Sequence, residues 1–320
     1  MVKVDMTLDL PTIRSAHERI QPHIHRTLVL TSSRLDEASR ASLFFKCENF
    51  QKIGAFKARG ATNAVFSLDD AIARRGVATH SSGNHGAAVA RAARLRGIPA
   101  HIVMPSNSAK VKIRAVESYG ARVVFCEPTE EARETVCADV IARTGATLIH
   151  SFENPYVIAG QGTAVVELLE DVPDLDLVTC PVGGGGLLAG TAVAAKSMRP
   201  NIRVVAAEPE NADDAAQSFH AGRVIHRDKK FTIADGLRTN VGEPNFEIIR
   251  RYVDDIVTVS EKAIVSAMRT IWETMKIVVE PSAGVPFAAI QEGKIDVAGK
   301  RVGIILTGGN VDLDALPWSL

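Results

Sequence analysis

Hydrophobic residues occur along the chain in short β-branched runs, separated by longer stretches with an apolar position every three or four residues. The short runs are typical of buried strands, and the longer repeat is typical of amphipathic helices. The predicted strands are Ser42–Lys46, Val77–Thr79, His101–Met104, Arg122–Phe125, Leu177–Cys180, Arg203–Ala207, Ile256–Val259 and Val302–Leu306. The predicted helices are Ala87–Arg96, Lys110–Tyr119, Glu130–Arg143, Gly160–Glu170, Leu187–Met198 and Glu261–Met275.

Strands that alternate with helices of this length predict βαβ units, and hence an α/β fold whose mostly parallel sheet is covered on both faces. The chain has 320 residues, which is enough for two domains. Regular small units between Thr79 and Glu153 indicate a small domain, residues 79–153, inserted into a larger domain of residues 1–78 and 154–320.

The charge balance excludes one class of partner. The chain carries 37 basic and 37 acidic residues without a basic cluster, so no nucleic-acid partner is predicted. Residues 177–195 contain no Asp, Glu, Lys or Arg and approach the length of a membrane-spanning helix. Pro181 and four consecutive glycines interrupt this stretch, so we predict a strand, a loop and a helix there, and no membrane span.

The cysteines and the first residues of the chain bear on its compartment. No C-x-x-C pair or Cys/His ligand spacing is present, which argues against a zinc site or a disulfide scaffold. The first residues contain no long apolar segment typical of a signal peptide. A cytoplasmic protein is therefore predicted. The cysteines are Cys47, Cys126, Cys137 and Cys180.

A polar loop, Ser81-Ser82-Gly83-Asn84-His85-Gly86, follows the predicted strand Val77–Thr79. Small hydroxyls, glycines and an amide before a helix expose several N–H donors to an anion, so the loop is a candidate site for a carboxylate. The alternative is an ordinary helix cap formed by Ser82 or Asn84. Taken alone, His85 is better explained as a structural residue.

A second loop consists of four consecutive glycines, Gly183, Gly184, Gly185 and Gly186, before the predicted helix Leu187–Met198. N–H groups without side chains, next to a helix N-terminus, form a cradle for a phosphate. The loop lacks the spacing of nucleotide-binding motifs, so a phosphate-bearing cofactor is indicated. The alternative is a flexible linker. The position of the loop between two packed elements argues against a linker.

The third segment contains Lys57, which lies between Phe56 and Ala58 in an expected loop from Asn49 to Gly60. A lysine in apolar surroundings has a lowered amine pKa, as Schiff-base chemistry requires. A surface lysine is the alternative. A lysine nucleophile, a phosphate cradle and a carboxylate loop together describe a pyridoxal phosphate enzyme that acts on an amino acid.

Six motifs in their order resemble the fold type II pyridoxal phosphate family, in its branch of serine racemases, serine/threonine dehydratases and 3-hydroxyaspartate dehydratases. The resemblance implies a fold like that of the tryptophan synthase β subunit, with two open, mostly parallel sheets flanked by helices, and a homodimer. The motifs are Phe44-Phe45-Lys46-Cys47-Glu48, the Lys57 segment, Ser81–His85, Ile158-Ala159-Gly160-Gln161-Gly162-Thr163, the four glycines and Thr232-Ile233-Ala234-Asp235-Gly236.

The resemblance also implies roles for individual residues. Lys57 matches the lysine that binds the cofactor as a Schiff base and removes the substrate's Cα proton. Gly183 to Gly186 match the phosphate cradle, and Asn84 matches the amide that contacts the phenolic oxygen. Thr307 matches a hydroxyl that faces the pyridine nitrogen, and a neutral group there suits rapid elimination.

Two further sets of residues follow from the same resemblance. Ser81, Ser82 and His85 match the substrate-carboxylate loop, and Arg133 matches a nearby substrate-recognition position. Glu208, the carbonyl of Ala212 and Asp214 match a divalent-cation site, where oxygen ligands suit Mg²⁺ (or Ca²⁺ or Mn²⁺). Without the family match, this segment is better explained as a solvated acidic turn.

Three hypotheses follow. The first is an ammonia-lyase that dehydrates serine, threonine or 3-hydroxyaspartate, with Arg133 or Arg238 as a partner for a second carboxylate. The second is a racemase that uses Lys57 and Ser82 as proton carriers on opposite faces of the substrate. The third is a non-catalytic amino-acid sensor, which predicts loss of the lysine that is present here as Lys57.

Overall fold

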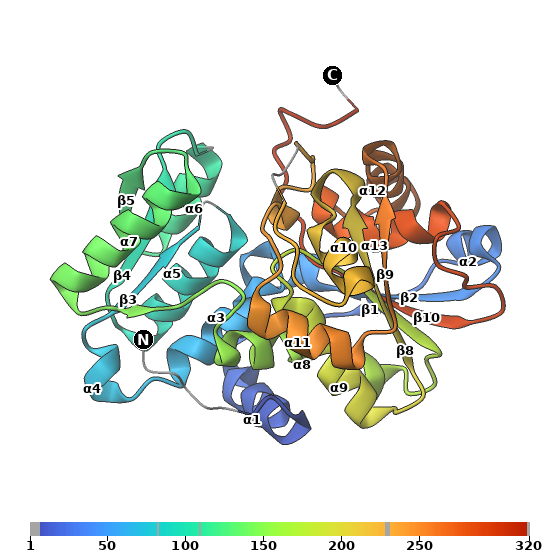
Figure 1. Ribbon diagram of the computed structural model, residues 1–320, viewed down its shortest axis with the longest axis horizontal. Helices are drawn as coiled ribbons and strands as arrows, with labels where there is room; N and C mark the ends of the chain where they lie inside the picture. Colours follow the sequence, from blue (N-terminus) through green and yellow to red (C-terminus); the bar gives the residue numbers. More distant parts are fainter. Residues whose placement is uncertain (1–6, 82, 109, 228–230, 319–320) are drawn as a thin grey trace.

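The computed structural model describes residues 7–81, 83–108, 110–227 and 231–318, and two sheets flanked by helices organise them (Figure 1). The larger sheet has six strands in the order β1-β2-β10-β7-β8-β9. All its neighbouring strands are parallel except β1 and β2. The strands are β1 (Val29–Leu30), β2 (Ser42–Cys47), β10 (Arg301–Leu306), β7 (Leu177–Pro181), β8 (Arg203–Pro209) and β9 (Asp255–Val259).

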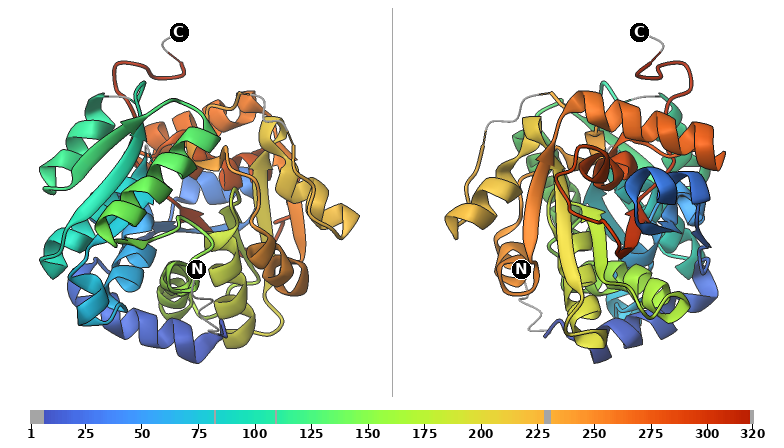
Figure 2. Two further views of the ribbon diagram at one scale, coloured as in Figure 1. Left: turned by 60° about the vertical axis from the view of Figure 1, so that its left-hand side comes forward. Right: turned by 90° about the vertical axis from the view of Figure 1, so that its right-hand side faces the viewer.

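Helices cover both faces of this sheet, and Figure 2 shows α9 and α12 on opposite sides of it. Successive residues of a strand point to opposite faces, so Val178 and Cys180 of β7 face one core while Leu177 faces the other. One face carries α1 (Leu10–Ile20), α8 (Pro155–Asp171), α9 (Gly186–Met198), α10 (Asp214–Ala221) and α11 (Glu243–Tyr252). The other carries α2 (Ser33–Ser39), α12 (Glu261–Met275) and α13 (Pro281–Gln291).

The smaller sheet has four parallel strands in the order β5-β4-β3-β6. Its strands are β5 (Arg122–Cys126), β4 (Ala100–Pro105), β3 (Val77–His80) and β6 (Thr147–Leu148). Helices α3 (Lys57–Phe66), α5 (Asn84–Arg96) and α6 (Lys110–Ser118) pack on one face, α7 (Glu130–Thr144) packs on the other, and α4 (Asp70–Ala73) precedes β3. The domain boundaries at residues 79 and 153 stay a prediction.

The structure confirms the eight predicted strands and six predicted helices, with ends shifted by a few residues. Helix α5 begins at Asn84 rather than Ala87, and α8 begins at Pro155 rather than Gly160. The prediction of a loop over the whole of Asn49–Gly60 was wrong, because Lys57 begins α3. In the part of the chain that the structure describes, no helix is long and apolar enough to cross a membrane.

Candidate active site

Two helix N-termini and the end of β10 meet between the two sheets. Lys57 is the first residue of α3, Asn84 is the first residue of α5, and Thr307 directly follows β10. The N–H of Phe56 donates to the carbonyl of Thr307 at 3.0 Å, and Ala55 forms a β-bridge with Gly308. These main-chain contacts hold the Lys57 segment against the end of the sheet, where ligands bind in open α/β folds.

The amine of Lys57 lies in a desolvated position. Its Nζ donates to the carbonyl of Ser151 at 2.8 Å and lies 5.2 Å from the ring centroid of Phe56. Burial disfavours the charged form and lowers the pKa of Lys57 to about 8. The expectation of a lysine with a lowered pKa is therefore supported, and the amine is available as a base and a nucleophile near neutral pH.

The glycine loop needs its glycines for two different reasons. Gly185 has a φ of +88°, a left-handed conformation that a residue with a side chain adopts only with strain. At Gly184, a Cβ atom would lie 2.3 Å from the ring of Phe152, so this ring packs directly on the main chain. Among the described residues, no acceptor binds the N–H groups of Gly183, Gly184 or Gly185. These donors fit a phosphate.

Thr307 has a side chain that fits a ligand. The residue is buried, and its Oγ1 has no hydrogen-bond partner among the described residues. Buried hydroxyls are normally hydrogen-bonded, so an unsatisfied one beside the Lys57 segment indicates a missing partner. A ring nitrogen of a bound cofactor is such a partner.

Asn84 is held by two side chains from distant parts of the chain. Its Nδ2 donates to Oε1 and Oε2 of Glu280 at 3.0 and 3.2 Å, and its Oδ1 accepts from Nδ2 of Asn310 at 2.9 Å. Glu280 is buried, and burial raises the pKa of its carboxyl to about 7. Asn84 was predicted from the sequence as a site residue, whereas Glu280 and Asn310 were not.

The carboxylate loop begins at Ser81 and continues past Ser82, which lies outside the described residues. The Oγ of Ser81 accepts from the N–H of Gly83 at 3.3 Å. His85 is buried, and its Nε2 lies 2.9 Å from the carbonyl of Ile149, to which it donates. Burial, together with the charge of Lys57, lowers the pKa of His85 to about 3. This ring is neutral, so it cannot offer a positive charge to a carboxylate.

Two further histidines line the region beside this loop. The rings of His80 and His150 lie 5.9 Å apart, and His150 packs on Phe152 at 4.6 Å. Burial lowers the pKa of both rings, to about 4 for His150, and the positive charge of Arg133 contributes at His80. Arg133 lies on α7, which packs against β3, the strand that ends at His80 just before the carboxylate loop.

Arg133 and Arg238 differ in their contacts. In the described part of the chain, Arg133 makes no ion pair, and its Nε donates to the carbonyl of Thr129 at 3.3 Å. Arg238 donates twice to the carbonyl of Thr232, at 3.1 and 2.6 Å, and lies over the ring of Phe231. Among the described residues, both Nη groups of Arg133 therefore lack a hydrogen-bond partner, whereas at Arg238 only Nη1 lacks one.

A fully buried ionic cluster lies behind Lys57. Arg59 donates to Glu48 and Glu167, and Lys46 also donates to Glu167 at 2.7 Å. The four side chains carry two positive and two negative charges, and each is at most 1% exposed. The cluster ties α3 to β2 and α8, and the sequence analysis did not predict it.

The predicted metal ligands lie behind the glycine loop. Glu208, at the end of β8, accepts from the N–H groups of Ala215 and Ala216, and Asp214 accepts from Val241 at 2.7 Å. Glu208, Ala212 and Asp214 are all buried. This excludes a solvated acidic turn and leaves an oxygen-only donor set that fits Mg²⁺. No group of three His, Cys, Asp or Glu residues within the described ranges could hold a metal ion.

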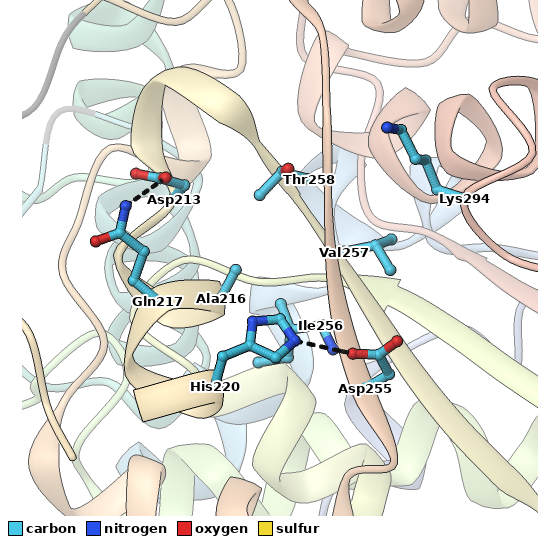
Figure 3. A pocket seen from close by; sticks show the side chains of 9 residues that line it. All are labelled: Asp213, Ala216, Gln217, His220, Asp255, Ile256, Val257, Thr258 and Lys294. Carbon is cyan, nitrogen blue, oxygen red and sulfur yellow. Dashed lines mark hydrogen bonds and ion pairs between the residues drawn. The ribbon is translucent and has the colours of Figure 1, made fainter. Parts of the chain in front are cut away.

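A separate pocket of about 380 Å³ opens between α10 and β9 (Figure 3). His220 and Asp255 approach each other there at 3.3 Å, and Gln217 donates to Asp213. None of the predicted cofactor-binding or substrate-binding residues lines it. The pocket is therefore distinct from the candidate active site.

Comparison with known proteins agrees with this geometry. The family model described as pyridoxal-phosphate dependent enzyme matches residues 20–308. The chain is 52% identical to a beta-hydroxyaspartate dehydratase of Paracoccus denitrificans over 305 residues, 95% of this chain and 97% of that protein. The structure of maize serine racemase superposes with a TM-score of 0.95 at 48% identity, covering 98% of this chain and 97% of the other. The structure of a T.th. threonine deaminase gives a TM-score of 0.91 at 42% identity, covering 95% and 99%.

The protein therefore belongs to the pyridoxal-phosphate-dependent enzymes of fold type II. Within them it falls in the branch that contains serine racemases, serine/threonine dehydratases and beta-hydroxyaspartate dehydratase. The resemblance found in the sequence is confirmed, and so is its fold class of two open, mostly parallel sheets. The assignment of roles to single residues stays a prediction.

Proposed function

We propose that this enzyme is an ammonia-lyase that dehydrates a 3-hydroxy amino acid to a 2-oxo acid and ammonia, with 3-hydroxyaspartate as its preferred substrate. The observation that carries the proposal is the desolvated amine of Lys57, which among the described residues has a main-chain carbonyl and no carboxylate as its hydrogen-bond partner. The 52% identity to a beta-hydroxyaspartate dehydratase supports the choice of substrate.

Each part of the site has a place in this reaction. Bound pyridoxal phosphate supplies an electron-withdrawing ring that makes the substrate's Cα proton acidic. Lys57, with its pKa lowered to about 8, holds or releases a proton near neutral pH and serves as the base at Cα. The N–H groups of Gly183 to Gly185 would hold the phosphate, and the neutral Oγ1 of Thr307 would leave the ring nitrogen without a counter-charge.

The second carboxylate of 3-hydroxyaspartate needs a cationic partner. Arg133 offers both of its Nη groups near the start of the carboxylate loop, whereas Nε and Nη2 of Arg238 already bind the carbonyl of Thr232. Arg–carboxylate pairs are often bidentate and strong. We therefore assign Arg133 to the second carboxylate, and Ser81 and Ser82 to the first.

An assay of serine, threonine and 3-hydroxyaspartate, which follows oxo acid and D-isomer together, tests this function. Arg133→Met should raise KM for 3-hydroxyaspartate at least about tenfold and leave KM for serine near its original value. Arg143→Met is the matched control, because Arg143 lies on the same helix and also donates from Nε to a main-chain carbonyl at 3.3 Å. Equal effects on both substrates would refute the assignment of Arg133.

Racemisation is the second candidate function. It is favoured by 48% identity to the solved serine racemase structure and by a serine at position 82. Racemisation requires a proton carrier on the face opposite Lys57, and Ser82 is the residue to which we assign it. The D-isomer measured in the same assay distinguishes the two activities.

A divalent cation is proposed at Glu208, Asp214 and the carbonyl of Ala212, with Mg²⁺ preferred. Two buried carboxylates and a carbonyl form an oxygen-only donor set, which is the set that Mg²⁺ prefers. Val241, which donates to Asp214, also packs within 3.3 Å of a Cβ built on Gly185. A cation there would support the glycine loop from behind.

A homodimer is proposed as the working form. Leu28, Phe50 and Val278 are exposed by 60%, 43% and 43%. They lie close together, because Cys47 binds the carbonyl of Leu28 and Asn49 binds that of Val278. Exposed apolar patches of this kind mark interfaces. A cytoplasmic location is proposed as well, supported by four buried cysteines that are all free.

A further inference from the structure

The side chain of Asn84 has a fixed orientation. An ionised carboxylate can only accept, so the Nδ2 end of Asn84 must face Glu280. The Nδ2 of Asn310 also donates to the carbonyl of Ile53 at 2.7 Å, so it is a donor toward the Oδ1 of Asn84. Both ends of the Asn84 amide are thereby determined, and one Nδ2 hydrogen is left for a ligand.

The carboxylate of Glu280 points to the candidate active site and not to the helix that Glu280 begins. It is the N-cap residue of α13, yet its carboxylate accepts no hydrogen bond from the N–H groups of that helix. It accepts from Asn84 and from the N–H of Asn310 at 3.2 Å. At Gly308, a Cβ atom would lie 2.8 Å from Oε1 of Glu280, so the glycine leaves room for the carboxylate.

We propose that Glu280 is a positioning residue for the cofactor, because its carboxylate holds the Asn84 amide with an Nδ2 hydrogen directed at the phenolic oxygen of pyridoxal phosphate. The inference rests on the contact proposed between Asn84 and that oxygen. Without the carboxylate, the amide can rotate and present Oδ1, which cannot donate. Glu280 then contributes to cofactor affinity through Asn84 and not by direct contact.

The ionisation of Glu280 adds a pH dependence. Burial and, to a smaller extent, the charge of Asp235 raise the pKa of Glu280 to about 7, against the opposing effects of the hydrogen bonds from Asn84 and Asn310 and the charge of Lys112. Asp235 and Lys112 are paired with each other at 2.5 Å. A protonated Glu280 resembles glutamine in shape and charge. The original enzyme and the Glu280→Gln variant should therefore differ in cofactor affinity mainly above about pH 7.

Titration of the apoenzyme with pyridoxal 5'-phosphate, followed by absorbance, tests the inference. Glu280→Gln should raise the cofactor Kd about tenfold at pH 8, the loss of one hydrogen bond to a charged group. Near pH 6, the cofactor Kd of Glu280→Gln should approach that of the original enzyme. Glu292→Gln is the matched control at the other end of α13, where the carboxylate accepts from Ser260 on the protein surface, and it should leave Kd unchanged.

A double-mutant cycle with Asn84→Ala separates positioning from other roles. If Glu280 acts through Asn84, adding Glu280→Gln to Asn84→Ala should weaken binding no further. Additive losses would overturn the inference, as would a Glu280→Gln variant with the original Kd. If Glu280→Gln fails to fold, Glu280→Asp replaces it in the same cycle. Glu280→Asp keeps the charge, so cofactor binding should still depend on pH. Loss of this pH dependence would overturn the inference. If Asn84→Ala alone leaves Kd unchanged, Asn84 does not contact the phenolic oxygen as the family resemblance implies, and the inference fails; the assay of oxo acid formation then still tests the proposed function separately.

Discussion

Arg59 and Glu48 form a fully buried ion pair through two parallel hydrogen bonds, from Nε to Oε2 at 2.7 Å and from Nη2 to Oε1 at 2.8 Å. Arg59 also donates from Nη1 and Nη2 to Glu167 and from Nη1 to the hydroxyl of Thr163, and Glu167 has Lys46 as a second cationic partner. Arg59 follows Lys57 by two residues on the same helix. The pair therefore fixes the first turn of α3, from which the lysine amine extends.

Arg59→Met should destabilise the protein by about 3–5 kcal/mol, because it leaves two buried carboxylates with one positive charge between them. Thermal or denaturant unfolding measures the loss. Arg26→Met is the matched control: Arg26 also pairs with two acidic residues, Glu170 and Asp171, but its side chain is 47% exposed. An exposed pair contributes less than about 1 kcal/mol. Equal losses in both variants would contradict a structural role for the buried cluster.

The sequence predicted the elements whose apolar pattern is strong and missed those whose burial is uniform. Helix α13 was missed because it is buried on all sides, with Val285, Phe287 and Ile290 spread around it, so no polar face marks a period. Strands β1 and β6 have two residues each, too short for any alternation. The start of α5 was placed late because Asn84 and His85 have low helix propensity.

The sequence predicts the site residues that lie together in one loop. It does not predict the residues whose partners are distant in the sequence. The glycine loop and the Lys57 segment show their residue types directly in the sequence. In the sequence, Glu280 has the position of an ordinary helix cap before Pro281. Its partner Asn84 is 196 residues away along the chain. The cluster around Arg59 likewise joins residues from β2, α3 and α8.

The apoenzyme should be stabilised by Lys57→Met at about pH 7. The pKa of Lys57 falls from 10.5 to about 8 on folding, so the folded state loses stability as the pH falls from 10.5 to about 8. Below about pH 8 the free energy of unfolding is reduced by the full amount, up to about 3 kcal/mol. The variant avoids this loss, so its advantage should be largest below about pH 8 and shrink toward pH 10.5.

Chemical denaturation of the apoenzymes at several pH values measures this difference. Lys262→Met is the control, since Lys262 is exposed on α12 and the variant should match the original protein throughout. An advantage of Lys57→Met that stays constant from about pH 7 to pH 10.5 would mean that the amine keeps its ordinary pKa in the folded protein.

Ser82→Ala should separate elimination from racemisation. Elimination removes the Cα proton from one face, for which Lys57 suffices, whereas racemisation returns a proton to the opposite face. The variant should lose D-isomer formation and dehydration of D-substrates, and largely keep elimination from the L-substrate; a modest rise in KM is expected from the carboxylate loop. Chiral chromatography of the products measures both. Equal losses of the two activities would make Ser82 a binding or capping residue.

Removal of divalent cations should lower the melting temperature and the turnover of the holoenzyme. A ligand that binds only the folded state stabilises it by about 2.7 kcal/mol at a hundredfold excess over its Kd. Glu208→Gln should abolish the response to added Mg²⁺, and Asp213→Asn, an acidic neighbour outside the predicted set that pairs with Arg227, should keep it. A metal-free enzyme with unchanged stability and turnover would exclude the cation site.

The most direct test of the proposed function is a competition between 3-hydroxyaspartate and serine in one reaction, followed by NMR. The loss of each substrate over time gives the ratio of their kcat/KM values without separate assays. We predict a ratio of at least about tenfold in favour of 3-hydroxyaspartate, with oxaloacetate and ammonia as products, and a ratio near one in Arg133→Met. Faster consumption of serine, or conversion of either substrate to its D-isomer without oxo acid, would contradict the assignment.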